Sequence, residues 1–385
     1  MRVLSIVPYP ILPLTHGGRV RAYRLAVGLA KAGAHVDLSC PWHPRMPLGP
    51  FEREGITIRP FVFAANLLPA LLGDRIVSPL LQLSGQPFTF GPRRLLRRTR
   101  LYDLVEFHFC AYASWMRRVT ANARVVYSAH NVEADYAVME PYSRIRTWFA
   151  PQIGKLERRA VHASDLVVAC TEADGSRFRQ LYGNPKELVI VSNGFDDGDL
   201  WSAKPRAREK TRAELGLRPE ELAILFVGGP AAHNRRAVHY LEHELLPRLN
   251  SPARLVLAGE CARPRRDDRV LSLGRVDELS PILEAADVAV NPIDSGSGSN
   301  LKLAEYLAVG MPIVTTSMGL RGYEEYAHLV TVAGLDDFPA AVQAGQHRAA
   351  HPRADVAALS WTALGRRLYA AYSDLVAGRS PSGSN

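Results

Sequence analysis

A loop rich in glycine and serine runs directly into a predicted helix in the C-terminal half of the chain. Residues 296–316 read GSGSNLKLAEYLAVGMPIVTT, with the helix expected at 300–309 and a strand after it. The first N–H groups of a helix have no partner within it, and the helix dipole places about half a positive charge there. We expect the N–H groups of Ser299, Asn300 and Leu301 to bind a diphosphate. The alternative is a helix start that contacts only solvent.

Two charged side chains lie in the first turns of this helix. Lys302 would add a positive charge near the diphosphate, and lysine is scarce here, with six lysines against 41 arginines. Glu305 lies among apolar residues, and an ionised carboxylate can accept hydrogen bonds from both hydroxyl groups of a ribose. The alternative is a salt bridge between Lys302 and Glu305 at i,i+3, worth a few tenths of a kcal/mol.

A second glycine-bearing turn follows the strand predicted at 223–228, where the sequence is GGPAAHNRRA. Such a turn lies at the edge of a sheet where α/β proteins bind ligands. Arg235 and Arg236 open the next helix, and we expect one of them to face the diphosphate, because arginine binds phosphate oxygens in bidentate fashion. The glycines alone are equally consistent with a tight turn that binds nothing.

The N-terminal half carries glycines and histidines at corresponding places. Gly17 and Gly18 lie at a predicted helix start and would let the backbone approach a ligand closely. His108 and His130 come just after two strands, VEFH and VVYSAH. Histidine at such an edge can bind a sugar hydroxyl or transfer protons near neutral pH, although a lone histidine is often structural.

The elements that position these residues alternate as strand and helix along most of the chain. Strands are expected at 2–7, 35–40, 104–107, 124–127, 166–169 and 188–191, with a polar linker at 193–219. A second alternation begins at 223. A chain of 385 residues exceeds the size of one hydrophobic core. The pattern predicts an α/β protein with two Rossmann-like, doubly wound parallel-sheet domains. We place them at residues 1–195 and 196–354, followed by a closing helix at 355–377 and a disordered tail at 378–385.

Composition narrows the classes of partner. The formal net charge of +9 comes from arginines spread along the chain, and no nucleic-acid recognition motif is present, so we expect no nucleic-acid partner. Four separated cysteines indicate neither a zinc site nor a disulfide framework. No signal peptide or membrane-spanning segment is evident, which predicts a cytoplasmic protein.

Together these residues resemble the retaining glycosyltransferases of family 4, which have the GT-B fold with two domains facing a cleft. The most specific part is GSGSNLKLAEYLAVGMPIVTT, which resembles the family's donor-binding loop, helix and strand. The resemblance makes Glu305 the ribose-binding residue. LGRVDELSPILEAADVAVNPI resembles the segment before it, and implies that Arg275 and Val276 contact the base through backbone groups. YDLVEFH resembles the strand that ends in the family's functional histidine, here His108.

SAHNVE resembles the family's next strand and loop, and we assign His130 and Asn131 to the acceptor. The predicted catalytic residues are His108, Lys302 and Arg235. The residues predicted to bind the nucleotide sugar are Gly17, Gly18, Gly229, Arg275, Val276, Ser297, Ser299, Asn300, Leu301 and Glu305. No metal ligand and no cofactor are predicted, since the nucleotide sugar is itself the substrate.

Two departures from the family pattern affect the diphosphate site. Ser297 stands where the family often has a glutamate, and Gly229 stands where it usually has an arginine. Arg235 falls near the family's usual lysine, so we expect Lys302 and Arg235 to supply the missing positive charge. Residues 84–98, SGQPFTFGPRRLLRR, resemble subgroup members linked to bacterial surface polysaccharides.

The resemblance implies metal-independent transfer of a hexosyl group from a nucleotide-diphosphate sugar to an acceptor hydroxyl, with retention. The alternatives are an epimerase or phosphorylase on the same fold, or a catalytically silent subunit that binds the nucleotide sugar. The acceptor is a small molecule, a saccharide or a lipid-linked sugar. Residues 61–73 and 92–100 would allow peripheral contact with the inner face of a membrane, or are simply a core helix and solvated arginines.

Overall fold

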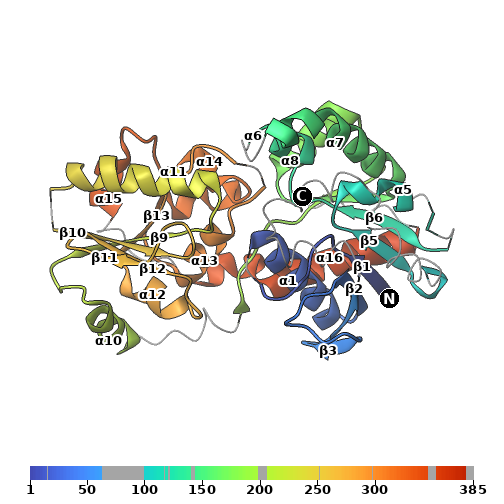
Figure 1. Cartoon of the computed structure of the whole chain (residues 1–385), viewed down its shortest axis with the longest axis horizontal. Coiled ribbons are helices and arrows are strands. Elements are labelled where there is room, and N and C mark those ends of the chain that lie inside the picture. The colour runs from blue at the N-terminus through green and yellow to red at the C-terminus, as the bar shows by residue number, and fades with distance from the viewer. Residues whose placement is uncertain are drawn as a thin grey trace. The chain divides into compact units, whose positions relative to one another are not determined.

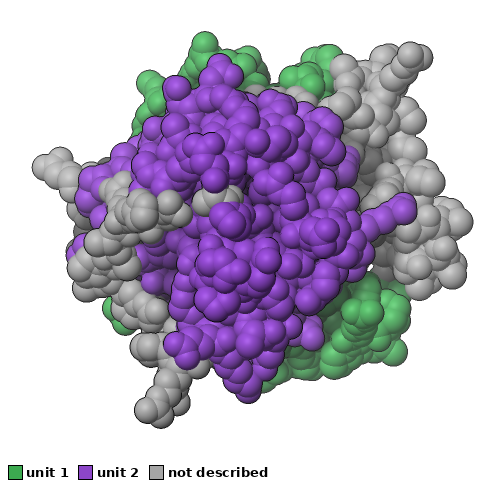
Figure 2. Space-filling view, turned by 90° about the vertical axis from the view of Figure 1, so that its left-hand side faces the viewer, with its two compact units in different colours: residues 1–192, 361–385 green, residues 193–360 purple. Residues whose placement is uncertain are grey.

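The computed structural model describes residues 1–14, 16–62, 99–116, 118–119, 122–139, 144–197, 206–250, 252–296, 298–345 and 353–378. The predictions for Ser297, for residues 84–98 and for the tail from 379 onward lie outside the described residues, as do most of those for 61–73 and 92–100. The chain forms two compact units, coloured separately in Figure 2. Unit 1 holds residues 1–192 and 361–385, and unit 2 holds 193–360.

Within the described residues, unit 1 contains an eight-stranded sheet in the order β3-β4-β2-β1-β5-β6-β7-β8. Every pairing is parallel except β3 with β4. The strands are β1 Arg2–Ile6, β2 His35–Pro41, β3 Phe51–Arg53, β4 Ile56–Phe61, β5 Leu104–Phe107, β6 Arg124–Ser128, β7 Leu166–Ala169 and β8 Leu188–Ile190. Strands β3 and β4 were not predicted from the sequence.

Helices cover both faces of this sheet, with α7 and α8 on one side and α1 and α16 on the other (Figure 1). The helices are α1 Gly17–Lys31, α5 Ala113–Met116, α6 Glu133–Met139, α7 Arg144–Ala163, α8 Glu172–Tyr182 and α16 Trp361–Val376. Gly28 and Gly365 let α1 and α16 meet backbone to backbone, because a Cβ atom on Gly365 would lie 2.3 Å from the carbonyl carbon of Gly28. The C-terminal helix therefore packs within unit 1.

Unit 2 repeats the architecture with a seven-stranded sheet, again counting described residues, in the order β11-β12-β10-β9-β13-β14-β15. The strands are β9 Leu222–Val227, β10 Ala253–Ala258, β11 Arg265–Arg266, β12 Val270–Gly274, β13 Val288–Asn291, β14 Ile313–Thr315 and β15 Thr331–Val332. The helices are α10 Arg206–Leu215, α11 Ala232–Tyr240, α12 Ser280–Ala285, α13 Leu301–Val309, α14 Ser317–Leu320 and α15 Phe338–Gly345. In Figure 1, α11 and α15 cover one face of the sheet, and α10 and α12 lie beyond the other.

The segment 193–219, predicted to be a polar linker, contains a helix that was not predicted, α10 at residues 206–215. Hydrogen bonds and an ion pair attach this helix to residues 285–287. Arg212 binds Oδ2 of Asp287 at 3.0 Å and the carbonyl of Ala285 at 2.9 Å, and Arg208 donates to the carbonyl of Ala286 at 2.7 Å. Because arginines make these contacts, the sequence shows no apolar periodicity.

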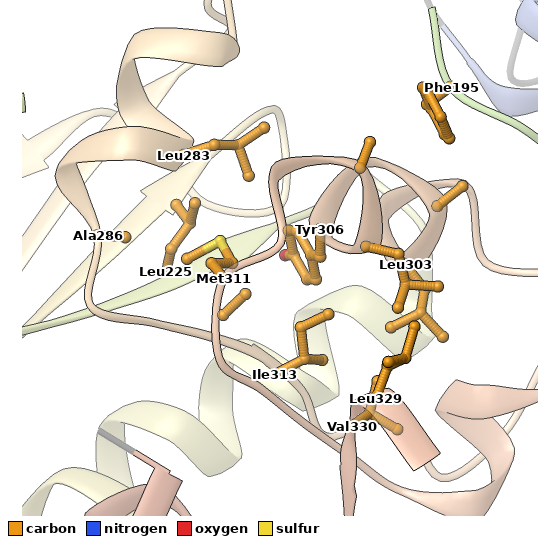
Figure 3. Close-up of a cluster of buried hydrophobic side chains, with 14 of the residues drawn as sticks. Phe195, Leu225, Leu283, Ala286, Leu303, Tyr306, Met311, Ile313, Leu329 and Val330 are labelled. Atoms are coloured by element: carbon orange, nitrogen blue, oxygen red, sulfur yellow. The ribbon is translucent and has the colours of Figure 1, made fainter. Parts of the chain in front are cut away.

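Helix α13 is held by apolar packing and ends where predicted. Leu303 and Tyr306 are fully buried, and Figure 3 shows them on this helix within the same apolar cluster as Met311 and Ile313. The hydroxyl of Tyr306 also accepts a hydrogen bond from the backbone N–H of Val227, which ties α13 to β9. Gly310 ends the helix with φ of +73°, a left-handed conformation that glycine adopts without strain.

Candidate functional site

The strand order places two loops of unit 2 side by side at the carboxyl edge of the sheet. β9 and β13 are neighbours in the sheet, although β10 and β12 follow β9 in sequence on its other side. Such a reversal of strand order opens a crevice beyond the strand ends, and ligands bind there in open α/β sheets. The loop that follows β9 carries Gly229, and the loop that follows β13 leads to α13. Both loops predicted to bind the diphosphate therefore lie at this point.

Lys302 is buried in the first turn of α13 and points to the start of α11. Its Nζ donates to Oδ1 of Asn234 at 2.8 Å and lies 4.2 Å from the centroid of the Phe226 ring. Asn234, which is 6% exposed, donates from Nδ2 to the carbonyl of Gly229 at 3.1 Å. A chain of hydrogen bonds thus links α13, α11 and the loop after β9.

Burial makes the ammonium group of Lys302 more acidic than that of an exposed lysine. Burial lowers the pKa of this ammonium group to about 7, although Cys261 and Glu305 nearby oppose the shift. An anionic ligand at the adjacent helix start would favour the protonated form, because opposite charges attract strongly at a site with little water.

Glu305 lies one turn further along α13 and is half-buried. Within the described part of the chain its carboxylate makes no hydrogen bond or ion pair, so the salt bridge with Lys302 considered above is not formed. Burial and the negative charge of Asp196 raise the pKa of Glu305 to about 7, and Lys302 lowers it in part. A buried carboxyl group without partners is costly and well suited to bind hydroxyl groups.

The loop before α13 is fastened to the start of unit 2. Oγ of Ser299 accepts the backbone N–H of Asn193 at 3.1 Å, and the carbonyl of Ser299 accepts Nδ2 of Asn193 at 2.9 Å. Asn300 precedes α13 but does not cap it, because its amide donates to the carbonyl of Gly319 at 3.2 Å. No described side chain caps the helix, which leaves the first N–H groups at Leu301 and Lys302 without a side-chain partner.

The arginines of α11 are both exposed. Arg235 bends back onto the carbonyl of Pro230, whereas Arg236 binds Oγ of Ser295 in the loop after β13. Arg236 thus joins α11 to the loop after β13, and Arg235 contacts the turn that precedes its own helix. A Cβ atom on Gly229 would meet no atom within 4 Å, so the backbone here is open to a ligand.

Two further predicted residues follow β12. Arg275 is exposed and Val276 is half-buried, and Val276 packs against the apolar cluster around α13. The preceding carbonyl, of Gly274, accepts the N–H of Gly259 at 2.7 Å. The strand ends of β10 and β12 are thereby joined, and Arg275 projects from the same edge of the sheet as the loop after β9.

Unit 1 has the same arrangement, with its reversal of strand order between β1 and β5. Helix α1 begins at Gly17, and His16 precedes it with Nδ1 accepting from the N–H of Arg19. A Cβ atom on Gly17 would touch nothing within 4 Å, whereas one on Gly18 would lie 3.1 Å from the hydroxyl of Tyr9 and 3.3 Å from Nδ1 of His130. Any residue larger than glycine at 18 would crowd these polar groups.

Tyr9 places a buried polar group beside Gly18. Its hydroxyl is buried and forms no hydrogen bond within the described residues. Burial raises the pKa of Tyr9 well above its usual range, so the hydroxyl keeps its proton. The hydroxyl is therefore a neutral donor at the edge of Gly18.

His108 and His130 lie side by side, as their positions after neighbouring strands predict. Nδ1 of His108 and Nε2 of His130 are 2.9 Å apart. His108 is only 4% exposed, and its Nε2 contacts Oγ of Ser5 at 2.8 Å and Oε2 of Glu106 at 3.3 Å. His130 is half-buried and faces Gly18. His130 is therefore the more accessible histidine of the pair, and His108 is buried.

Glu157 holds the loop that carries His130 and the half-buried Asn131. This fully buried carboxylate on α7 accepts the N–H groups of Glu133 at 2.8 Å and Ala134 at 3.0 Å, at the start of α6. The hydroxyls of Tyr127 and Tyr182 donate to it at 3.1 and 2.8 Å. Glu157 on α7 therefore fixes the end of the loop between β6 and α6.

Several residues that shape these sites were not predicted from the sequence: Tyr9, Asn234, Glu106, Glu157 and Tyr372. Glu106 left a signal, because a carboxylate within the apolar strand LVEF needs a buried partner. The other four residues show no local sequence signal, because their neighbours in the fold are distant in sequence.

No helix of the described residues is both long enough and apolar enough to cross a membrane. No cluster of three or more histidine, cysteine, aspartate or glutamate residues there is arranged to hold a metal ion.

Known proteins resemble the chain in sequence. The family model described as Glycosyltransferase Family 4 matches residues 15–199, and the one described as Glycosyl transferases group 1 matches residues 221–345. D-inositol 3-phosphate glycosyltransferase of Corynebacterium glutamicum is 22% identical over 407 residues, covering 95% of this chain and 94% of that protein. The enzyme of the same name from Rhodococcus erythropolis is 27% identical over 247 residues, covering 57% of this chain and about half, 53%, of that protein.

Solved structures share the fold at low sequence identity. Sucrose-phosphate synthase from Thermosynechococcus elongatus matches with a TM-score of 0.73 and 16% identity, over 98% of this chain and 100% of that chain. Anabaena HepE, in a crystal structure in complex with UDP, matches with a TM-score of 0.62 and 16% identity, over 98% and 97% of the two chains. Given these matches and its two Rossmann-type α/β units, the chain is a glycosyltransferase of family 4 with the GT-B fold.

Proposed function

We propose that this glycosyltransferase transfers a hexosyl group from a nucleotide-diphosphate sugar to an acceptor hydroxyl, with retention at the anomeric carbon and without a metal ion. The observation that carries the proposal is the position of Lys302, whose ammonium group is held by Asn234 beside the uncapped start of α13. An ammonium group and free N–H groups together suit a diphosphate leaving group.

The diphosphate gains negative charge as the glycosidic bond to the donor breaks. Fixed positive groups at that position stabilise the transition state, and each such donor contributes about 3 to 4 kcal/mol in other enzymes. Lys302 supplies one charge, and the helix start supplies aligned dipoles. Arg235 and Arg236 add mobile positive charge at the rim. These groups take the part that a divalent metal plays in other sugar transferases.

Glu305 is the proposed ribose ligand, and the backbone at Arg275 and Val276 the proposed contact to the base. The half-buried carboxylate, which has no hydrogen-bond partner among the described residues, supports this assignment, because two ribose hydroxyls would satisfy it. The complexes of Anabaena HepE with UDP and with UDP-glucose support a uridine nucleotide as the first donor to try.

The acceptor is proposed to bind unit 1 near Gly18, His130 and Asn131. The inositol phosphate in the names of the Corynebacterium and Rhodococcus relatives supports a polyhydroxylated acceptor. Saccharide and lipid-linked acceptors, a role in surface polysaccharides, a cytoplasmic location and peripheral membrane contact stay predictions.

The proposal is tested in two stages with purified protein. Thermal stability is first measured with UDP, GDP, ADP, CDP and dTDP in the presence of EDTA, where a ligand at about 100 times its Kd stabilises by about 2.7 kcal/mol. The matching nucleotide glucose is then incubated with inositol 3-phosphate, and the product's anomeric configuration is read by NMR. Stabilisation by no diphosphate would refute the donor site, and an inverted product would refute retention.

A further inference from the structure

Asn193 is a buried residue to which the proposed reaction assigns no role. It is 8% exposed and is the first residue of unit 2. Its backbone N–H donates to Oγ of Ser299 at 3.1 Å, and its Nδ2 donates to the carbonyl of Ser299 at 2.9 Å. Its own carbonyl accepts a hydrogen bond of 3.2 Å from the hydroxyl of Tyr323, a fully buried residue. Asn193 therefore ties the loop before α13 to the interior of unit 2.

The loop before α13 depends on such a tie. Gly296 and Gly298 have φ of +140° and +68°, and glycine reaches many backbone conformations because it has no Cβ atom. The side chain of Asn300 does not cap the helix but donates from Nδ2 to the carbonyl of Gly319 at 3.2 Å. The end of the loop is therefore held by hydrogen bonds to residues distant in sequence, of which Asn193 is one.

The amide of Asn193 fixes the peptide group that joins Ser299 to Asn300. This peptide is trans, because Leu12–Pro13 is the one cis peptide bond in the described part of the chain. The C=O and N–H of a planar trans peptide point in opposite directions. Since the carbonyl of Ser299 points at Nδ2 of Asn193, the N–H of Asn300 points away from it.

The N–H of Asn300 is available to a ligand. It forms no hydrogen bond with any residue that the structure describes, and Asn300 is only half-buried. The next N–H groups, of Leu301 and Lys302, also lack partners among those residues, as expected for the first turn of a helix. Three successive N–H groups at a helix start suit the oxygens of a phosphate. Asn193 sets the direction of the first of them.

A fixed N–H group serves the reaction better than a mobile one. Negative charge grows on the diphosphate as the bond to the sugar breaks, and a donor that already points at it requires no rearrangement. A mobile loop would first have to be ordered, which weakens binding. The amide of Asn193 is neutral, so it orients the peptide without adding a charge beside the helix start.

We propose that Asn193 is a positioning residue of the donor site: by holding the carbonyl of Ser299, it directs the N–H of Asn300 toward the diphosphate of the sugar donor. The identity of this ligand rests on the proposed function, whereas the orientation of the N–H by Asn193 does not. Asn193 lies 106 residues from Ser299 in sequence, so the donor loop owes its shape to the segment where the chain enters unit 2.

The orientation is tested first in the free protein, by ¹⁵N relaxation of the Asn300 N–H in the ¹⁵N-asparagine-labelled full chain, with Asn300→Ser used for assignment. In the wild type we expect an order parameter of about 0.85, as in rigid backbone, and in Asn193→Leu a fall toward about 0.6. Leucine has a similar shape but no donor. A low value in the wild type would overturn the proposal, as would the wild-type value in a folded Asn193→Leu variant.

Tyr323→Phe is the matched control. It removes a hydrogen bond to the carbonyl of Asn193 and leaves the contact of Nδ2 with Ser299 in place. Thermal unfolding should show a loss of stability in both variants, but the order parameter of the Asn300 N–H should fall only in Asn193→Leu. An equal loss of order in both would show that Asn193 serves the stability of unit 2 alone, and the proposal would be overturned.

The use of the Asn300 N–H is tested by titration with UDP, GDP, ADP, CDP and dTDP in the presence of EDTA. The diphosphate that binds the wild type should shift the Asn300 proton downfield, because the N–H then donates to a charged oxygen. Its Kd should rise roughly tenfold in Asn193→Leu and less than about twofold in Tyr323→Phe, since hydrogen bonds to charged groups are among the stronger ones.

Failure of the positioning role can be told apart from failure of the donor site. If a diphosphate binds the wild type and the Asn300 signal does not move, the donor site stands and the role of Asn193 is refuted. An unchanged Kd in Asn193→Leu refutes that role as well. If no diphosphate binds, the proposed function fails and the ligand of Asn300 with it, while the relaxation data still decide whether Asn193 orients the N–H.

Discussion

The ammonium group of Lys302 donates a hydrogen bond to Oδ1 of Asn234 at 2.8 Å, joining the first turns of α13 and α11. Asn234 extends the contact to the carbonyl of Gly229. The two loops at the reversal of strand order in unit 2 are therefore held together by one buried cation. Loss of that cation should affect both loops.

Replacing Lys302 by methionine keeps much of the side-chain volume and removes the charge. Binding of the nucleoside diphosphate identified above should weaken by about 10- to 100-fold, because a hydrogen bond to a charged group is worth about 1.5 to 3 kcal/mol. Isothermal titration calorimetry measures the change. Lys210→Met is the control, since Lys210 is an exposed residue on α10. Equal affinity in the Lys302 variant and the wild type would exclude Lys302 from the phosphate site.

Glu305→Gln should increase the stability of the protein and weaken ligand binding. The pKa of Glu305 is raised to about 7 in the folded protein, so the folded state resists ionisation of this group. Its stabilising contribution is fully present below the unfolded pKa and is lost as the pH rises through about 7. Glutamine avoids that loss, so the variant should gain about 1 to 2 kcal/mol over the wild type between pH 5 and pH 8.

The gain is measured by urea unfolding at pH 5 and pH 8, with exposed Glu244→Gln as the control. The same Glu305 variant should bind the ribonucleotide at least about tenfold more weakly. If the difference in the free energy of unfolding between variant and wild type were the same at pH 5 and pH 8, burial would not raise the pKa of Glu305.

Gly229→Arg should restore the arginine that the family pattern has at this position. The site has room, because a Cβ atom there meets nothing within 4 Å. The added charge should tighten diphosphate binding by a few-fold, since an exposed ion pair is worth about 0.2 to 1 kcal/mol. Gly228→Ala is the contrasting variant, because its Cβ atom would lie 3.1 Å from Asn234 and 3.0 Å from Phe226. If the Gly229 variant bound more weakly than the wild type, the phosphate would lie elsewhere.

Glu157→Ala should destabilise unit 1 and loosen the loop that carries His130. The substitution removes four hydrogen bonds and leaves the hydroxyls of Tyr127 and Tyr182 without this partner. We expect a loss of about 3 to 5 kcal/mol, as for other buried polar networks that lose one member. Hydrogen exchange of the N–H groups of Glu133 and Ala134 should become faster than in the wild type.

The control for that measurement is Glu172→Ala, at an exposed position in the first turn of α8. Exchange at Glu133 and Ala134 should not change in this variant. Unchanged exchange in Glu157→Ala as well would show that the loop is held by other contacts.

Local patterns in the sequence were enough to predict the parallel α/β architecture and the loop and helix that lead to Glu305. Apolar strands, glycine at helix ends and helical spacing are properties of neighbouring residues, so they can be read without the fold. Helix α10 was not predicted, because ion pairs with Asp287, distant in sequence, attach it in place of an apolar face. Strand β3 has only three residues, whereas β4 has six and was missed although its apolar and polar residues alternate in part.

Only the tertiary structure decided which charged groups are paired. The sequence allowed Lys302 to bond Glu305 on its own helix, but packing turns Lys302 toward Asn234, 68 residues away, and Glu305 forms no hydrogen bond or ion pair with any residue that the structure describes. The same holds for His108, which packing places behind His130 and against Glu106. The charge and exposure of these groups depend on burial and on neighbours brought together by the sheet, and the sequence lists residue types without their surroundings.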